Sequence, residues 1–120
     1  MARILSISYD PTLSRIRRLL LEKLGHSVTS AEGFKEAIEL CDQEAGAFDL
    51  MVLGHSIPHD DKRAIISHCT QTCPCPVLAL TLINEPPVIE AVRSIDPSDT
   101  RAFLAAVQEL LARSKGDHAP

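Results

Sequence analysis

Aromatic side chains are scarce in this sequence, which contains no tryptophan, one tyrosine and three phenylalanines. Leucine, isoleucine, valine and alanine must therefore supply most of the volume of the hydrophobic core. The chain has 120 residues, which is the usual size of one domain. A chain of that length can bury enough apolar surface to fold without a structural metal or a disulfide framework.

The sequence also lacks a long hydrophobic run. Its first apolar stretch, at positions 4–7, is interrupted by Ser6 and is far too short for a signal peptide or a membrane-spanning helix. We therefore expect a cytoplasmic protein without a membrane partner. In that compartment all four cysteines are expected to be reduced thiols: Cys41, Cys69, Cys73 and Cys75.

An excess of positive charge is missing as well. The 12 Lys and Arg residues are outnumbered by 16 Asp and Glu residues, which gives a formal net charge of −4. Nucleic acids and anionic membranes are usually bound by basic faces, so we expect neither as a partner. Arg15, Arg17 and Arg18 lie close to Glu22 in the sequence, and we interpret them as part of the solvated face of a helix.

Recognisable catalytic motifs are absent. The sequence contains no Gly-rich phosphate loop, no Ser-His-Asp arrangement and no pair of carboxylates placed for acid–base chemistry. We therefore predict that the protein is not an enzyme and that it needs no cofactor.

One group of three cysteines and a histidine could in principle bind a metal ion, because thiolate and imidazole are ligands of Zn²⁺. The group consists of His68, Cys69, Cys73 and Cys75. It lacks the usual C-x₂-C spacing, and Pro74 stiffens the segment between the last two cysteines. Cys69 also falls on an apolar helical stripe. We expect no metal site, and a Cys/His metal or redox sensor remains an alternative.

The order of apolar patterns predicts strands that alternate with helices. Strands are expected at 3–8, 27–30, 49–53, 77–81 and 91–95, and helices at about 11–24, 33–44, 61–72 and from Ser98 or Asp99 onward. This alternation indicates βαβ units and a parallel sheet covered on both faces. Between the last two strands, Pro86-Pro87 leaves room only for a shortened or missing helix. The domain is expected to span residues 1–114, and 115–120 to form a disordered tail.

Several short segments follow one another in a specific order: Ile4–Ile7 with Asp10-Pro11, Leu24–Val28, Phe48–Leu53 with Ile57-Pro58, Pro76–Thr81, and Pro97. Together they resemble the receiver domain of two-component response regulators over about residues 2–114. The resemblance implies a flavodoxin-like (CheY-like) three-layer α/β/α sandwich. Its parallel sheet would have five strands in the order 2-1-3-4-5.

The resemblance also implies where a phosphorylation site would lie. A working receiver has an acidic pair that binds Mg²⁺ after strand one, a phosphoacceptor Asp after strand three, a hydroxyl residue after strand four and a Lys after strand five. These positions correspond to Ser8 and Tyr9, Gly54, Thr81 and Asp96, of which Thr81 alone matches. We therefore predict a vestigial pocket, which also includes Asp10, with no phosphoryl transfer and no bound Mg²⁺.

Neighbouring acidic residues offer an alternative acceptor, which would make the protein a weakly active receiver. Asp10 lies beside the acidic pair, and Asp60 and Asp61 lie in the loop after the third strand. We interpret Asp10 as a helix N-cap ahead of a proline, and the other two as acids at the start of a helix. His55 and His59 are expected to be solvated loop histidines.

The function predicted from these residues is phosphorylation-independent protein–protein interaction in signal transduction, with another signalling protein or a second copy of the chain as partner. The predicted contact surface is the segment between the last two strands, with Pro86, Pro87, Val88, Ile89 and Arg93. Consecutive prolines favour an extended segment that could present the two apolar residues within a polar rim. The alternative is that Val88 and Ile89 turn inward and cover the flank of the sheet.

Overall fold

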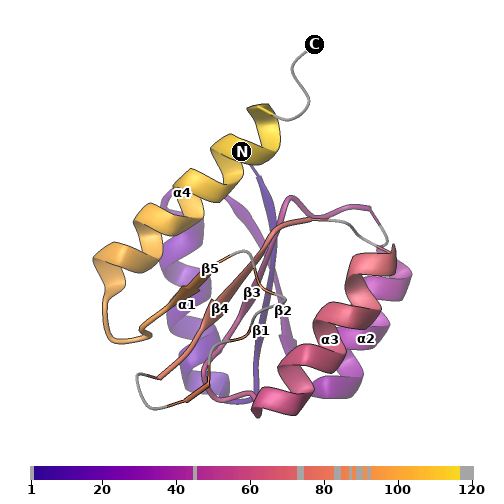
Figure 1. Ribbon diagram of the computed structural model, residues 1–120. Helices are drawn as coiled ribbons and strands as arrows, with labels where there is room; N and C mark the ends of the chain where they lie inside the picture. Colours follow the sequence, from indigo (N-terminus) through magenta and orange to yellow (C-terminus); the bar gives the residue numbers. More distant parts are fainter. Residues whose placement is uncertain are drawn as a thin grey trace.

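Figure 1 shows the computed structural model of the protein, which describes residues 2–44, 46–72, 75–82, 85, 86, 88, 91 and 93–116. Strands and helices alternate in the order β1 (Arg3–Ser8), α1 (Pro11–Lys23), β2 (Ser27–Glu32), α2 (Phe34–Gln43), β3 (Leu50–Leu53), α3 (His59–Thr72), β4 (Val77–Leu80), β5 (Arg93–Ile95) and α4 (Thr100–Gly116). The strands and helices expected from the sequence are thus present, with their ends shifted by a few residues.

The strands form one parallel sheet of five strands in the order β2-β1-β3-β4-β5. Helices α1 and α4 cover one face of the sheet, and α2 and α3 cover the other (Figure 1). The predicted fold class, a three-layer sandwich with flavodoxin-like strand order, is therefore confirmed.

Alternate residues of each central strand supply two separate hydrophobic cores. In β3, Leu50 and Val52 point toward α1 and α4, whereas Met51 and Leu53 point toward α2 and α3. Successive side chains of a strand project to opposite faces, so an uninterrupted apolar run is what a sheet covered on both sides requires. Because all five strands run parallel, their carboxyl ends lie at one edge of the sheet.

Helix α1 begins as the sequence predicts but presents a different face to the core. Asp10 caps it, because its Oδ1 accepts hydrogen bonds from the backbone N–H groups of Thr12 at 2.9 Å and Leu13 at 3.3 Å. The helical spacing of Leu13, Ile16, Leu20 and Leu24 predicts a buried stripe, and this prediction is wrong in part. Ile16 is 49% exposed, and the buried residues of this helix are instead Ser14, Arg17 and Leu21.

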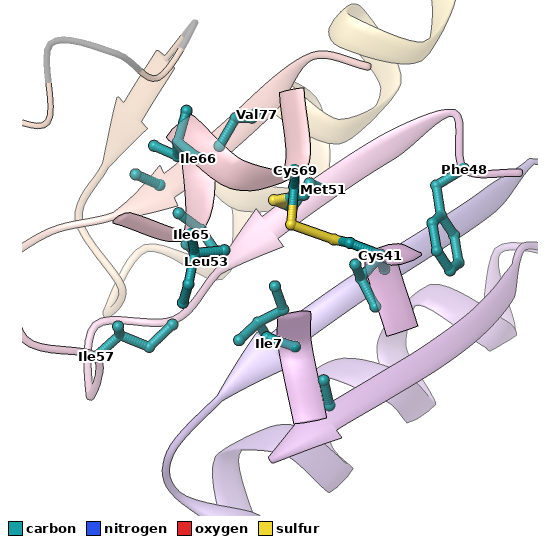
Figure 2. Close-up of a cluster of buried hydrophobic side chains, with 14 of the residues drawn as sticks. Ile7, Cys41, Phe48, Met51, Leu53, Ile57, Ile65, Ile66, Cys69 and Val77 are labelled. Atoms are coloured by element: carbon teal, nitrogen blue, oxygen red, sulfur yellow. A yellow bond between two sulfur atoms is a disulfide. The ribbon is translucent and has the colours of Figure 1, made fainter. Parts of the chain in front are cut away.

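Two inward-facing cysteines correct the expectation that all thiols are reduced. Cys41 of α2 and Cys69 of α3 form a disulfide, with their Cα atoms 5.7 Å apart (Figure 2). Helical spacing predicts both residues on buried stripes, Cys41 with Phe34, Ala37 and Ile38 and Cys69 with Ile65 and Ile66, and both cysteines are fully buried. Because α2 and α3 pack side by side, the two stripes meet. Cys75 packs against the same core outside this disulfide, and Cys73 lies outside the described residues.

The segment between β4 and β5 contains no helix among its described residues, in agreement with the predicted loss of the fourth helix. Val88 is 2% exposed and belongs to the core under α3, so its predicted place on an exposed contact surface is wrong. The inward alternative holds for Val88, because its side chain packs in the same core as Ile65 and Ile66 of α3. Pro86 is exposed, and Pro87 and Ile89 lie outside the described residues.

Arg93, which also belongs to the predicted contact surface, binds to the last helix, α4. The Arg93 guanidinium donates two hydrogen bonds to the Glu109 carboxylate, one of them 2.7 Å long. Helix α4 continues to Gly116, past the predicted domain boundary at 114, and residues 117–120 lie outside the described part of the chain. None of the described helices is both long and apolar enough to cross a membrane.

Candidate functional site

The residues predicted to form the pocket follow the ends of neighbouring parallel strands. Ser8 ends β1, and Gly54, Thr81 and Asp96 directly follow β3, β4 and β5. The Gly54 N–H donates to the carbonyl of Ile7 at 2.8 Å, which continues the pairing of β1 with β3. All four positions therefore lie at the carboxyl edge of the sheet, where ligands bind in open α/β folds.

Hydroxyl groups connect the loop after β1 to the loop after β3. The Oγ atoms of Ser8 and Ser56 share a hydrogen bond of 3.2 Å. The backbone N–H of Tyr9 donates to Ser56 Oγ at 3.0 Å, and the backbone N–H of Asp10 donates to Ser8 Oγ at 3.1 Å. Ser56 was not singled out from the sequence, because nothing about a lone serine in a loop predicts these partners.

Tyr9 reaches from the end of β1 to the first turn of α3. Its hydroxyl donates a hydrogen bond to Asp61 Oδ2 at 2.9 Å, and its ring packs against the core under α2 and α3. Burial, together with the hydrogen bond and negative charge of Asp61, raises the pKa of Tyr9 to about 12. The phenol therefore stays protonated, and Asp61 is engaged as its acceptor.

Arg17 occupies the space beside Gly54, which corrects its interpretation as a solvated residue. Its side chain leaves α1 and is only 6% exposed. Nη1 lies 2.6 Å from the point that a β-carbon on Gly54 would occupy. Nη2 makes a hydrogen bond of 3.1 Å with His55 Nδ1. A side chain at position 54 and the guanidinium at its present place exclude each other.

This contact favours the neutral form of His55. A guanidinium can only donate hydrogen bonds, so His55 Nδ1 must be the acceptor and carries no proton. Burial, followed by the positive charges of Arg17 and Lys62, lowers the pKa of His55. This loop histidine is thus partly buried and paired, and not simply solvated as expected.

Lys62 is the second buried cation at this edge. Its side chain is fully buried in α3, and its Nζ donates to the carbonyl of Leu80 at 2.9 Å. Burial lowers the pKa of Lys62, whereas the negative charge of Glu85 acts in the opposite direction. Lys62 was missed in the sequence, although it lies on the stripe that continues through Ile65 and Cys69 at helical spacing.

Thr81 and Asp96, which were also predicted for the pocket, differ in burial and in hydrogen bonding. Thr81 Oγ1 is buried and has no hydrogen-bond partner among the described residues. Asp96 is exposed and accepts hydrogen bonds from the side chain and the backbone N–H of Ser98, which lower its pKa. Asp99 caps α4 by accepting from the N–H of Ala102 at 2.9 Å. The carboxylate of Asp96 is therefore used in the turn that leads to α4.

The residues at this edge do not fit a Mg²⁺ ion. Mg²⁺ prefers carboxylate oxygens in an octahedral arrangement, and the side chains closest to the position 54 β-carbon are the guanidinium of Arg17 and the hydroxyl of Ser8. Asp10 Oδ1 accepts from two backbone N–H groups at the start of α1. Within the described part of the chain, no group of three His, Cys, Asp or Glu residues is placed to hold a metal ion.

Comparison with known proteins identifies the fold. No protein-family model and no curated protein sequence matches the chain. Among solved structures, a response regulator receiver domain protein from Clostridium thermocellum superposes with a TM-score of 0.85 at 20% identity, over 96% of this chain and 98% of that one. The N-terminal domain of a response regulator/sensory box/GGDEF protein from Carboxydothermus hydrogenoformans gives 0.84 at 19% identity, over 98% and 99% of the two chains.

A third similar structure contains the response regulator TrrA of Thermotoga maritima in complex with the histidine kinase ThkA. It superposes with a TM-score of 0.74 at 19% identity, over 92% of this chain and 99% of that one. These similarities show that the chain has the fold of response regulator receiver domains.

Proposed function

We propose that this chain is a degenerate receiver domain that acts in signal transduction through protein–protein contact and without phosphoryl transfer. The observation that carries the proposal is the position of Arg17, whose Nη1 lies 2.6 Å from where a β-carbon on Gly54 would be. By the resemblance to receivers, the phosphoacceptor is expected at this residue. Glycine has no nucleophile, and a guanidinium takes the space that an acidic side chain would need.

The neighbouring carboxylates are engaged elsewhere. Asp10 caps α1, Asp61 accepts from Tyr9, and Asp96 accepts from Ser98. Phosphoryl transfer depends on the position of the nucleophile and on charge neutralisation by metal ions. These contacts therefore argue against Asp10 or Asp61 as a displaced acceptor, and Asp60 has a fully exposed side chain at the start of α3.

The nature of the partner rests on fold analogy. TrrA, which has a similar fold, was solved in complex with a histidine kinase. By that analogy we propose another signalling protein as the partner, with a second copy of the chain as the alternative. The contact surface does not include Val88, because this residue is buried in the core.

The direct test is incubation with acetyl phosphate and Mg²⁺, followed by intact-mass measurement of the whole chain. We expect no covalent phosphoryl adduct. Asp10→Asn and Asp61→Asn serve as diagnostic variants, and Asp42→Asn, on the exposed side of α2, serves as the matched control. A stoichiometric phosphoryl adduct that disappears in Asp10→Asn or Asp61→Asn but persists in Asp42→Asn would identify a displaced acceptor and refute the proposal.

A second candidate function, a redox-responsive interaction module, is favoured by the disulfide between Cys41 and Cys69. The disulfide connects α2 with α3 and closes a loop with a sequence separation of 28. Partner association measured with oxidised and reduced protein tests this function. A redox module would change its affinity in wild type and not in Cys41→Ala/Cys69→Ala, whereas equal affinities in both states would leave the disulfide a purely structural element.

A further inference from the structure

We propose that the outer edge of β2 binds an extended, acidic peptide segment of a partner protein as a sixth strand of the sheet. The site consists of this edge and an adjoining pocket, and we call it the β2 edge site. The pocket is lined by Pro11, Ser14, Arg15, Arg18, Ser30 and Glu32. The inference rests on the proposed function of protein–protein contact, for which it supplies a surface and a class of partner. The two can fail separately, because peptide binding leaves no covalent adduct and phosphoryl transfer needs no peptide.

The backbone of β2 is paired on one side. β2 is the first strand in the order of the sheet, and no described strand pairs with its other side. The Ser27 N–H donates to the Ala2 carbonyl of the chain entering β1 at 2.8 Å, so Ser27 and every second residue after it face β1. The N–H and carbonyl groups of Val28, Ser30 and Glu32 therefore point outward. An extended peptide can pair with such groups.

β2 also lacks the features that usually protect an edge strand, which are short length, lysine and proline. The other edge strand, β5, has only 3 residues, and its Arg93 binds Glu109 of α4. β2 has 6 residues, and its sequence of SVTSAE contains neither lysine nor proline. Of the two edges of the sheet, the edge of β2 is therefore the one suited to strand addition.

The pocket beside this edge lies between α1 and β2 and has a volume of about 200 Å³. The Oγ of Ser30, in its wall, is buried and has no hydrogen-bond partner among the described residues. Ser6 is paired with Ser30 in the register of β1 and β2, and its fully buried Oγ is also unpartnered within the described chain. Buried hydroxyl groups nearly always have a partner. A carboxylate that enters the pocket would accept from the unused Ser30 hydroxyl.

The charges of the pocket select an acidic side chain. Arg15 and Arg18 lie on the same side of α1 and both line the pocket, whereas Glu32 is the one acidic residue in its lining. Arg15 forms no ion pair among the described residues, and Arg18 forms an exposed pair with Glu22 at 3.3 Å. Guanidinium groups bind carboxylates through charge-assisted hydrogen bonds. The excess of positive charge therefore favours Asp or Glu over a neutral or basic side chain.

An added strand would bring such a side chain to the pocket. Neighbouring strands lie about 4.8 Å apart, and side chains opposite each other project to the same face about 5 Å apart. Ser30 projects toward α1, because it lines the pocket together with residues of that helix. The peptide residue opposite Ser30 would project toward α1 as well. A second copy of the chain fits less well, because identical surfaces would meet and bring the same arginines together.

The experiment is a titration of the full chain with the capped peptide Thr-Val-Thr-Glu-Thr-Val-Thr, which has the same sequence in both directions. Peptides with Gln or Lys in place of Glu are the controls. Calorimetry at low ionic strength, where exposed charges are least screened, gives the affinities. We expect a dissociation constant below about 1 mM for the Glu peptide, with the Gln peptide about threefold weaker and the Lys peptide weaker still. The Glu peptide should also protect the amides of Ser30 and Glu32 from hydrogen exchange.

Charge variants test the selection of the acidic side chain. Arg15→Gln and Arg18→Gln should each reduce the preference for the Glu peptide over the Gln peptide, and the double variant should abolish it. Lys23→Gln is the matched control, since Lys23 is exposed in the last turn of α1 and does not line the pocket. An equal affinity of the wild-type protein for all three peptides would contradict the selection of an acidic side chain.

Backbone variants test strand addition. Ser30→Pro removes one outward N–H and should abolish peptide binding, whereas Ser30→Ala keeps this N–H and should weaken binding at most about threefold. Glu32→Pro, compared with Glu32→Ala, is the second blocking pair if Ser30→Pro folds poorly. Absence of saturation below about 10 mM peptide, or full binding in a folded proline variant, would overturn the proposal. Protection of the Ser30 amide that rises with protein concentration alone would identify a second copy as the occupant and would also overturn it.

Discussion

The interior of the sheet and its carboxyl edge differ in how their buried groups are satisfied. In the interior, β3 places apolar side chains against helices on both faces, and a disulfide joins two of those helices. At the edge, Arg17 and Lys62 are buried beside neutral partners, and Arg17 Nη1 has no partner among the described residues. The interior is therefore expected to contribute more to stability than the buried cations of the edge.

The largest expected effect is the loss of a core side chain. Leu53 is fully buried in the core under α2 and α3, directly before Gly54. Leu53→Ala should lower the free energy of unfolding by about 2–5 kcal/mol, because both transfer energy and packing are lost. Urea unfolding measures the effect, with the exposed Leu19→Ala as the matched control. A loss below about 1 kcal/mol would contradict the assignment of this residue to the core.

Reduction of the disulfide is expected to have the next largest effect. Opening the Cys41–Cys69 link releases a loop with a sequence separation of 28 and should lower the free energy of unfolding by about 3 kcal/mol. Urea unfolding with and without a reducing agent measures the difference. Cys75→Ala should remain sensitive to the reductant, whereas Cys69→Ala should not. Equal unfolding midpoints with and without reductant in wild type would show that the link makes no contribution.

A smaller effect is expected for Tyr9 at the edge. Tyr9→Phe removes the hydroxyl that donates to Asp61 at 2.9 Å but keeps the ring in the core. The free energy of unfolding should fall by about 1.5–3 kcal/mol, since one hydrogen bond to a charged acceptor is lost. Thermal or urea unfolding at neutral pH measures it, and Tyr9→Phe in an Asp61→Asn background should cost less. An equal cost in both backgrounds would show that the two side chains do not interact.

The smallest effect is a pH dependence that His55 adds to stability. Burial and two neighbouring cations lower the pKa of His55 in the folded protein below its ordinary value of 6.5. As pH falls below about 6.5, the unfolded chain takes up a proton on His55 before the folded chain does, and the folded state is destabilised. The loss is complete once pH falls below the pKa of His55 in the folded protein.

Unfolding followed from about pH 7.5 down to about pH 5 tests this dependence. His55→Gln should flatten part of the decrease, because the substituted side chain does not titrate. His68→Gln is the control, since His68 is more exposed and pairs with Asp42 on the surface. If His55→Gln follows the wild-type curve throughout this range, His55 does not contribute to the acid sensitivity.

Sequence reasoning was most successful where local patterns decide the structure. Continuous apolar runs identify strands that are buried on both faces, and Asp10-Pro11 identifies the start of α1, because these signals need no knowledge of distant residues. The disulfide could not be predicted from local patterns, because it joins residues with a sequence separation of 28. The inward faces of Cys41 and Cys69 were predicted, but their meeting depends on how α2 and α3 pack together.

The basic residues of the site were missed because charge is an ambiguous signal. Arg17 lies between Leu13 and Leu21 at helical spacing, and Lys62 begins the stripe that leads to Ile65, so both occupy inward positions. A charged residue on a helix is normally exposed. Arg17 is buried because there is a space beside Gly54, a residue that is far from Arg17 in the sequence. Predicted positions for Gly54 and Thr81 at the sheet edge were correct, whereas their buried neighbours required the structure.

The most direct test of the account is a double-mutant cycle between Arg17 and position 54. Gly54→Ala adds a β-carbon 2.6 Å from Arg17 Nη1, and Arg17→Ala removes the guanidinium. Crowding of the new β-carbon against Ile7 and Ser8 is common to both backgrounds and cancels in the cycle. If Arg17 fills the space beside position 54, Gly54→Ala should cost less in the Arg17→Ala background, which gives a repulsive coupling of about 1 kcal/mol or more in urea unfolding. A coupling near zero, or an attractive one, would contradict the claim that Arg17 occupies this space.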